Sequence, residues 1–176
     1  PLWLLPIAIC VKLSSPGPVL FKQKRTGFMG REFNCLKFRT MRVNNESDKL
    51  QATKGDPRIT RIGEFLRKTS LDELPQIINI LMGKMSIVGP RPALWNQYDL
   101  IEERDKYGAN DVMPGLTGWA QINGRDELEI DVKAKLDGEY VKKFGFIMDL
   151  KCFFGTITAV LSHKGVVEGG TGEMHK

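Results

Sequence analysis

The sequence predicts an α+β fold, mostly helical, with a short β-hairpin and further small β elements. Apolar residues recur at helical spacing in several stretches after residue 59, which indicates amphipathic helices. Two β-favouring stretches flank glycines at positions 27 and 30, which is typical of a hairpin. The 176 residues, 41% of them apolar, are enough for one domain with a real core.

The first element is an apolar stretch over residues 1–13, which has the pattern of a helix and ends at Ser14. It lacks the basic start and the cleavage site of a signal peptide, and it is shorter than the ~20 residues that span a bilayer. Two interpretations stay open. The stretch is a buried core helix, or it lies at a membrane interface, where Trp3 and Lys12 would reach the headgroups.

The hairpin strands are predicted over residues 19–24 and 32–41, and the polar stretch 44–56 is predicted to be a loop. Helices are predicted over 60–68, 70–81, 94–107, 130–144 and 146–161. Between them, residues 89–92 (GPRP) must be extended and stiff, because each proline fixes its own φ and restricts the residue before it. Asn123-Gly124 is a turn signal, and the glycines after residue 164 predict a mobile tail.

Basic residues outnumber acidic ones by 26 to 21, and the excess lies in the first quarter of the chain. Such a block favours anionic partners, namely lipid headgroups, nucleotide phosphates or nucleic acid; the alternative is a solvated face. Aromatic residues are not interleaved with the block as stacking platforms, so we expect no nucleic-acid partner. The block comprises Lys12, Lys22, Lys24, Arg25, Arg31, Lys37, Arg39 and Arg42, opposed by Glu32.

The cysteines and histidines do not indicate a zinc site, a disulfide framework or a Ser-His relay. Cys10, Cys35 and Cys152 lie far apart and are odd in number, so we expect neither a zinc site nor a disulfide framework. The chain has two histidines, which argues against zinc centres and Ser-His relays.

Asp72 and Glu73 are adjacent carboxylates at the start of a predicted helix. Ser70 to Glu73 matches a capping box with Ser70 as N-cap; alternatively Asp72 is the N-cap, and Pro75 then falls in the first turn, where it is tolerated. Both registers place the acids at the positive end of a helix, which favours their ionised forms. A carboxylate can attack phosphorus and a neighbouring one can hold a divalent metal, so the pair either caps the helix or performs phosphate chemistry.

Phosphoryl transfer also needs positive charge around the transferred group. Arginine suits this role because its planar fork binds two oxygens of a phosphate. Candidate cations in stiff or turn contexts are Lys37, Arg39, Arg67, Arg91 and Arg125. Each alone could be an ordinary surface charge, but together they favour an anionic substrate.

Four motifs follow one another along the chain: residues 37–41 (KFRTM), 70–76 (SLDELPQ), 85–92 (MSIVGPRP) and 114–125 (PGLTGWAQINGR). In order and approximate spacing, they resemble those of the bacterial sugar transferases, the monotopic polyprenyl-phosphate phosphoglycosyl transferases. The likeness covers nearly the whole chain.

The resemblance implies an enzyme that transfers a sugar phosphate from a UDP-sugar to undecaprenyl phosphate and releases UMP, the first membrane step of bacterial glycoconjugate synthesis. In that family the aspartate of the Asp-Glu dyad attacks the β-phosphorus of the donor and forms a covalent phosphosugar intermediate. Carried over, Asp72 is the nucleophile and Glu73 the Mg²⁺ ligand. The residues that would bind substrate and phosphate are Lys37, Arg39, Arg67, Arg91, Gln121, Arg125 and Asp149. Asp149 alternatively pairs with Lys151 or another neighbour.

The family's N-terminal helix is re-entrant, so it enters and leaves the membrane by the same leaflet. Residues 1–13 would be the second arm of a truncated re-entrant helix, 14–165 the catalytic domain and 166–176 a flexible tail. The protein would then be monotopic at the cytoplasmic face of the bacterial inner membrane, with membrane lipids as partners. Met113 stands where many relatives carry arginine, so the donor preference of relatives does not carry over. The rival hypothesis is a non-catalytic membrane-surface module that uses the basic first quarter.

Overall fold

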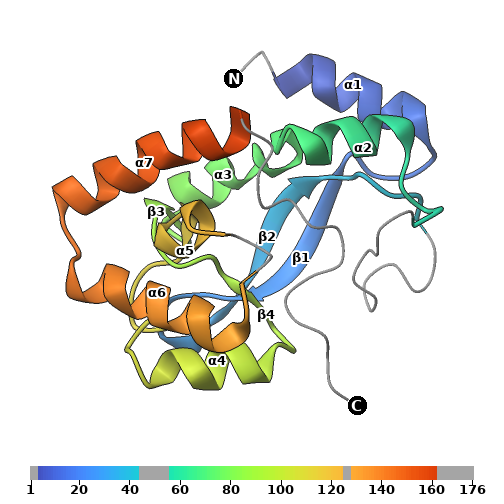
Figure 1. Ribbon diagram of the computed structural model, residues 1–176. Coiled ribbons are helices and arrows are strands. Elements are labelled where there is room, and N and C mark those ends of the chain that lie inside the picture. Colours follow the sequence, from blue (N-terminus) through green and yellow to red (C-terminus); the bar gives the residue numbers. More distant parts are fainter. Residues whose placement is uncertain (1–3, 44–55, 125–127, 162–176) are drawn as a thin grey trace.

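The computed structural model describes residues 4–43, 56–124 and 128–161, and it has the predicted α+β architecture with small sheets (Figure 1). The helices are α1 (Leu4–Ser14), α2 (Arg61–Lys68), α3 (Gln76–Leu81), α4 (Tyr98–Asp105), α5 (Trp119–Ile122), α6 (Ile130–Lys142) and α7 (Phe146–Leu161). The strands are β1 (Leu20–Thr26), β2 (Glu32–Phe38), β3 (Ser86–Val88), β4 (Ala93–Leu94) and β5 (Gly115–Thr117), and single 3₁₀ turns occur at η1 (Phe28–Gly30) and η2 (Leu71–Glu73).

The predicted hairpin is confirmed. Strands β1 and β2 pair antiparallel from Leu20 opposite Phe38 to Thr26 opposite Glu32, and η1 closes the turn between them. The short strand β4 adds to the other edge of β1, which gives the order β2-β1-β4. A second sheet pairs β3 with β5 in parallel, and the sequence pattern did not predict it.

Asn79 of α3 closes the outer edge of β2. Its side-chain amide donates to the carbonyl of Asn34 at 2.9 Å, and its amide oxygen accepts from the N–H of Leu36 at 2.9 Å. The side chain is fully buried, so it satisfies strand groups that water cannot reach. One polar residue therefore joins α3 to the sheet.

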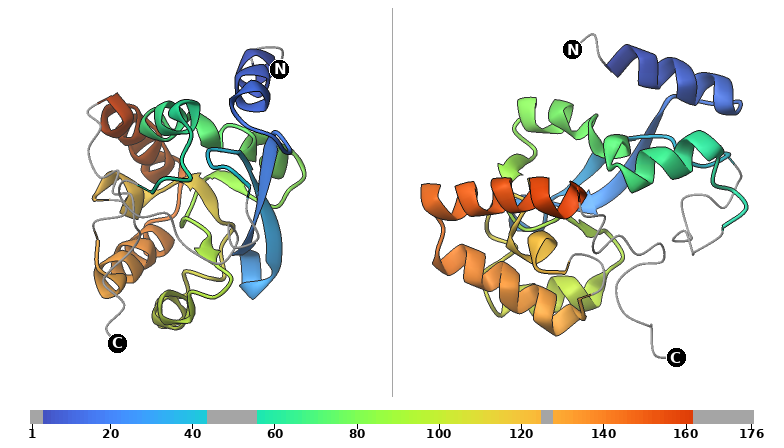
Figure 2. Two further views of the ribbon diagram at one scale, coloured as in Figure 1. Left: turned by 90° about the vertical axis from the view of Figure 1, so that its right-hand side faces the viewer. Right: turned by 45° about the horizontal axis from the view of Figure 1, so that its top comes forward.

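The helices form two layers, with the sheets between them. Helices α1, α2, α3 and α7 lie along one side in Figures 1 and 2, and α4 and α6 lie on the other. Val11, Phe38 and Leu66 form a core that joins α1, β2 and α2. Tyr140, Met148 and Cys152 form a second core between α6 and α7.

Exposed apolar side chains gather on the layer made by α1, α2, α3 and α7, which we call the apolar layer. They are Leu5, Ile9, Leu13, Phe65, Ile77, Ile78, Leu81, Phe146, Ile147, Leu150, Phe153, Phe154 and Ile157. On α4 and α6, by contrast, the large exposed apolar residues are Tyr98 and Val132. Within the described ranges, every helix is too short or too polar to cross a membrane.

Two predicted helices differ from the observed ones. The helix predicted over 70–81 is wrong: η2 is a separate turn, and α3 begins at Gln76. Ser70 adopts φ 56° and its side chain makes no cap bond, while Pro75 occupies the position before α3, so both predicted cap registers are wrong. The helix predicted over 94–107 begins only at Tyr98, because Ala93 and Leu94 pair with β1 instead. Residues 44–55 of the predicted loop over 44–56 lie outside the described residues, as does the predicted tail.

Candidate active site

Asp72 and Glu73 lie on η2, at the junction between α2 and α3. Ser70 turns the chain with a left-handed backbone, and the side chains of Leu71 and Leu74 then pack against the Val11, Phe38 and Leu66 core. These apolar anchors fix the turn, and the two acids between them are 9% and 8% exposed. Core packing therefore holds a turn that presents two nearly buried carboxylates.

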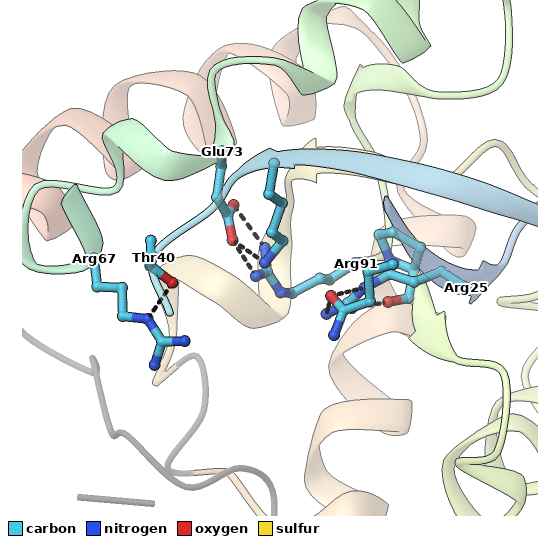
Figure 3. Close-up of polar contacts among 8 residues, drawn as sticks. Arg25, Thr40, Arg67, Glu73 and Arg91 are labelled. Carbon is cyan, nitrogen blue, oxygen red and sulfur yellow. Dashed lines mark hydrogen bonds and ion pairs between the residues drawn. The ribbon is translucent and has the colours of Figure 1, made fainter. Parts of the chain in front are cut away.

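Glu73 is held by cations from two other segments. Its Oε1 accepts from Lys37 Nζ on β2 at 3.0 Å, and its Oε2 accepts from Arg91 Nη1 at 3.0 Å. Arg91 Nη2 also bonds Oε1, so the arginine fork engages both carboxylate oxygens (Figure 3). The three side chains retain between 10% and 22% exposure, so the centre is partly open to solvent.

Asp72 has a different environment from its neighbour. Among the described residues, its carboxylate takes part in no hydrogen bond or ion pair, although Lys37, Arg67 and Arg91 are close enough to act on it electrostatically. Burial raises the pKa of the Asp72 carboxyl, and the positive charges of Lys37, Arg67 and Arg91 oppose that shift. The expectation that a helix end would favour ionisation is therefore wrong for Asp72, because desolvation dominates.

Arg67 comes from the last turn of α2. Its Nε donates to Thr40 Oγ1 at 2.9 Å, which fixes the base of the guanidinium group beside the centre (Figure 3). Lys37, Arg67 and Arg91 thus surround Asp72 and Glu73, and positive charge exceeds negative charge here. Such an arrangement can bind an anion between the arginines and the Asp72 carboxylate.

Arg39 has another role. It is 5% exposed and donates to the carbonyls of Ser15 at 2.6 Å, Pro16 at 2.7 Å and Val11 at 3.1 Å. Gly17, with φ 126°, allows this approach, because a Cβ there would lie 2.2 Å from Arg39 Nη1. The structure therefore places Arg39 at the end of α1 and not among the cations around the dyad.

Gln121 and Asp149 lie on α5 and α7. Both amide atoms of Gln121 are buried and have no hydrogen-bond partner among the described residues, which leaves a donor and an acceptor for a ligand. Asp149 accepts from Tyr140 Oη at 2.8 Å, which replaces the predicted alternative pairing with Lys151. Arg125 lies outside the described residues.

Sequence reasoning missed Tyr140, which is 1% exposed and also lies 3.3 Å from the carbonyl of Val88. It therefore joins α6 both to α7 and to the strand that leads into Arg91. The available signal was a large side chain with a polar tip on the predicted core face of α6, because such a tip needs a buried partner.

A metal site of protein side chains alone does not form here. Within the described residues, no group of three or more histidine, cysteine, aspartate or glutamate side chains could hold a metal ion. The dyad supplies only carboxylate oxygens, which are the hard ligands that Mg²⁺ prefers, and Mg²⁺ commonly takes one or two carboxylates together with substrate phosphates and water. The donor set fits an ion that arrives with a phosphorylated substrate.

Comparison with known proteins gives a consistent assignment. The family model for bacterial sugar transferases matches residues 1–163. The chain is 50% identical over 161 residues to the Escherichia coli protein named UDP-glucose:undecaprenyl-phosphate glucose-1-phosphate transferase, covering 86% of this chain and 34% of that protein. It is 45% identical over 174 residues to the protein of the same name from Xanthomonas campestris, covering 93% and 36%.

A shorter relative matches along most of its length. The exopolysaccharide production protein ExoY of Rhizobium meliloti is 39% identical over 181 residues, covering 94% of this chain and 79% of that protein. The chain thus spans about a third of the two transferases named above and most of the shorter relative. The motifs, the dyad with its cations and these matches agree, and the chain belongs to the bacterial sugar transferase family.

Proposed function

We propose that the protein transfers a sugar 1-phosphate from a UDP-sugar to undecaprenyl phosphate and releases UMP. The observation that carries this proposal is that Glu73 and Asp72 have different hydrogen-bonding environments. Glu73 is held by Lys37 and Arg91, whereas Asp72 makes no hydrogen bond among the described residues and faces the same cations. A buried, unengaged carboxylate beside excess positive charge is suited to attack a bound phosphate.

The reaction takes place in two displacements. An oxygen of ionised Asp72 forms a bond to the β-phosphorus of the donor, and the bond from that phosphorus to the bridging oxygen breaks, so UMP leaves with the electron pair. An oxygen of undecaprenyl phosphate then forms a bond to the phosphorus of the phosphosugar, and the bond from that phosphorus to the Asp72 oxygen breaks, which releases the carboxylate. Arg67, Arg91 and Lys37 neutralise the charge that develops on the phosphoryl oxygens.

Glu73 has two parts in this scheme. Its ion pairs fix Lys37 and Arg91, and its carboxylate would hold Mg²⁺ together with the donor phosphates. When bound, Mg²⁺ would neutralise phosphate charge during the displacement. Gln121, whose amide has no hydrogen-bond partner among the described residues, would bind the donor, and Asp149, positioned by Tyr140, would take the substrate-binding role that the resemblance implies.

UDP-glucose is the first donor to test, because the names of the relatives from Escherichia coli and Xanthomonas campestris include UDP-glucose. Met113 precedes the 114–125 motif and is not a charged residue, so a panel of donors is needed.

The apolar layer supports membrane attachment. Exposed phenylalanine and aliphatic side chains on α1, α2, α3 and α7 would enter the interfacial region of a bilayer without crossing it. Because η2 joins α2 to α3, the dyad lies next to this layer, where a lipid-linked phosphate would arrive. We propose that the protein is a monotopic enzyme at the cytoplasmic face of the inner membrane.

The rival membrane-surface module finds less support, because three cations of the basic block are engaged within the protein. Lys37 pairs with Glu73, Arg39 turns inward to α1, and Lys24 pairs with Glu32 at 2.6 Å. These positive charges already have partners within the protein and are less available to bind acidic lipid.

The test measures UMP release from UDP-glucose, UDP-galactose and N-acetylated UDP-amino sugars, with Mg²⁺ and undecaprenyl phosphate. Without lipid acceptor, mass spectrometry should find one phosphosugar on the peptide that contains Asp72. Asp72→Asn should abolish both signals, a loss of about 10⁴-fold or more for a missing nucleophile. Asp99→Asn, the same change on the exposed start of α4, is the matched control. Turnover of Asp72→Asn at the wild-type rate would refute the nucleophile assignment.

A further inference from the structure

The segment over residues 89–92 positions Arg91 beside Glu73, and few backbone hydrogen bonds are available to hold this segment in place. Its two prolines have no N–H to donate, so the carbonyls must provide much of the anchoring. The carbonyl of Pro90 accepts from the N–H of Gly115 at 2.9 Å, which ties the start of the segment to β5. The carbonyls of the next two residues are held by side chains.

Arg104 of α4 holds the carbonyl of Arg91. Its Nη1 donates to that oxygen at 2.8 Å, while its Nε and Nη2 donate to Oδ2 of Asp137 on α6 at 2.8 and 2.5 Å. The side chains of Arg104 and Asp137 are 3% and 0% exposed. Asp137 thus fixes the guanidinium plane of Arg104, and Arg104 fixes the backbone from which Arg91 extends.

The carbonyl of the following residue, Pro92, is held by a side chain from the hairpin. Arg25 of β1 donates from Nη1 to the carbonyl of Pro92, and its Nε and Nη2 bond Gln23 Oε1 at 3.0 and 2.8 Å (Figure 3). Arg91 therefore leaves a backbone that is clamped by arginines from the sheet and from the α4/α6 layer.

A sealed ion pair of this kind is poor evidence for a stabilising role. Desolvation of both charges offsets their attraction, and replacement of a buried pair by apolar residues of similar volume is often neutral or stabilising. The contact of Arg104 with the Arg91 carbonyl gives the pair a different use, because a small displacement of a phosphate-binding group is costly to a reaction.

We propose that Arg104 and Asp137 are positioning residues that hold Arg91 in register with Glu73 and with the phosphate bound beside Asp72. The inference rests on the proposed function for its catalytic consequence. The positioning itself depends only on the geometry of the described residues, so each can be tested separately.

The first experiment replaces the pair as a unit, Arg104→Met with Asp137→Leu, in the full chain. The double variant should unfold at a higher temperature than either single variant, because each single substitution leaves one buried charge without its partner. UMP release by the double variant should nevertheless fall about 10- to 100-fold, in kcat rather than KM. Glu103→Gln with Lys106→Gln removes an exposed ion pair from the same helix and is the matched control. Recovery of both stability and turnover by the double swap would overturn the proposal.

A second measurement tests whether Arg104 and Asp137 affect turnover by positioning Arg91. Added to Arg91→Ala, the swap should change turnover by less than about twofold, because a residue that acts only through Arg91 has nothing left to position. An equal loss with and without Arg91 would overturn the inference.

The third measurement needs no activity. In ¹⁵N-labelled protein, the Nε–Hε resonance of Arg91, assigned by its loss in Arg91→Lys, should shift or broaden in the double swap and not in the control. An unchanged resonance would overturn the positioning role even if turnover falls. If wild-type protein releases no UMP from any donor, the proposed function fails while this resonance still decides the positioning.

Discussion

The two layers of the molecule differ in what they expose. The apolar layer presents phenylalanine and aliphatic side chains on α1, α2, α3 and α7, whereas α4 and α6 expose mainly charged residues and bury the Arg104–Asp137 pair. The dyad lies at the boundary, on the turn that connects two helices of the apolar layer. In the proposed mechanism, the reacting carboxylate therefore belongs to the same structural unit as the surface that would meet lipid, while α4 and α6 supply the Arg104–Asp137 pair that supports the Arg91 backbone.

The comparison predicts that changes at the dyad damage chemistry and changes on the apolar layer damage attachment. Glu73→Gln should have the larger effect. Glutamine keeps the size of the side chain but removes the charge opposite Lys37 and Arg91, so turnover should fall about 100-fold or more. The Mg²⁺ concentration for half-maximal UMP release should rise about 10- to 100-fold.

Glu103→Gln on α4 serves as the control for Glu73→Gln, because it makes the same change on the opposite layer. Binding of the Glu73→Gln variant to vesicles should equal that of wild type. A Mg²⁺ titration that does not move would assign the metal ligand to another residue.

The second prediction concerns attachment. Phe146→Ser and Phe154→Ser remove side chains that are 76% and 60% exposed on α7. If each ring enters the bilayer interface, each substitution should weaken partition onto anionic vesicles about 10- to 100-fold. Co-sedimentation with the vesicles measures the change. Val132→Ser on α6 is the control from the opposite layer, and equal binding by all three variants would contradict the two-layer interpretation.

The sequence predicted the elements whose signal is local. Helix α7 was predicted with its observed bounds, and the hairpin was predicted because β-favouring stretches flank its glycine turn. The parallel pairing of β3 with β5 was not predictable, since strands of three residues are too short to show a period. The break between η2 and α3 depends on the left-handed backbone of Ser70 and on core packing of Leu71 and Leu74, which no local pattern encodes.

The candidate site was also predicted only in part. Motif spacing and family resemblance identified the dyad and its cations, but they could not separate Arg39 from Arg67. Each arginine follows an apolar residue and precedes a polar one in sequence, and only the fold directs Arg39 to the end of α1 and Arg67 to Thr40. The support that Arg104 of α4 gives to Arg91, 13 positions earlier in the chain, depends on tertiary packing.

The smallest expected effect is the contribution of buried Asp72 to the folding stability of the protein. Because burial raises the pKa of Asp72 above its ordinary 3.8, the folded state binds this proton more tightly than the unfolded state does. The stability that Asp72 contributes is therefore complete below pH 3.8 and is lost as pH rises through the folded-state pKa. Asp72→Asn should then unfold at a higher temperature than wild type at pH 7, and the difference should shrink at acidic pH.

Thermal unfolding of both proteins across this pH range measures the effect, with Asp99→Asn as the exposed control. The same raised pKa places the acid limb of turnover above pH 3.8, since the attacking carboxylate must be ionised. A less stable Asp72→Asn at pH 7 would mean that Lys37, Arg67 and Arg91 outweigh burial. The carboxylate would then be a structural counterion of these cations, and the difference between Asp72 and Glu73 on which the proposed mechanism depends would disappear.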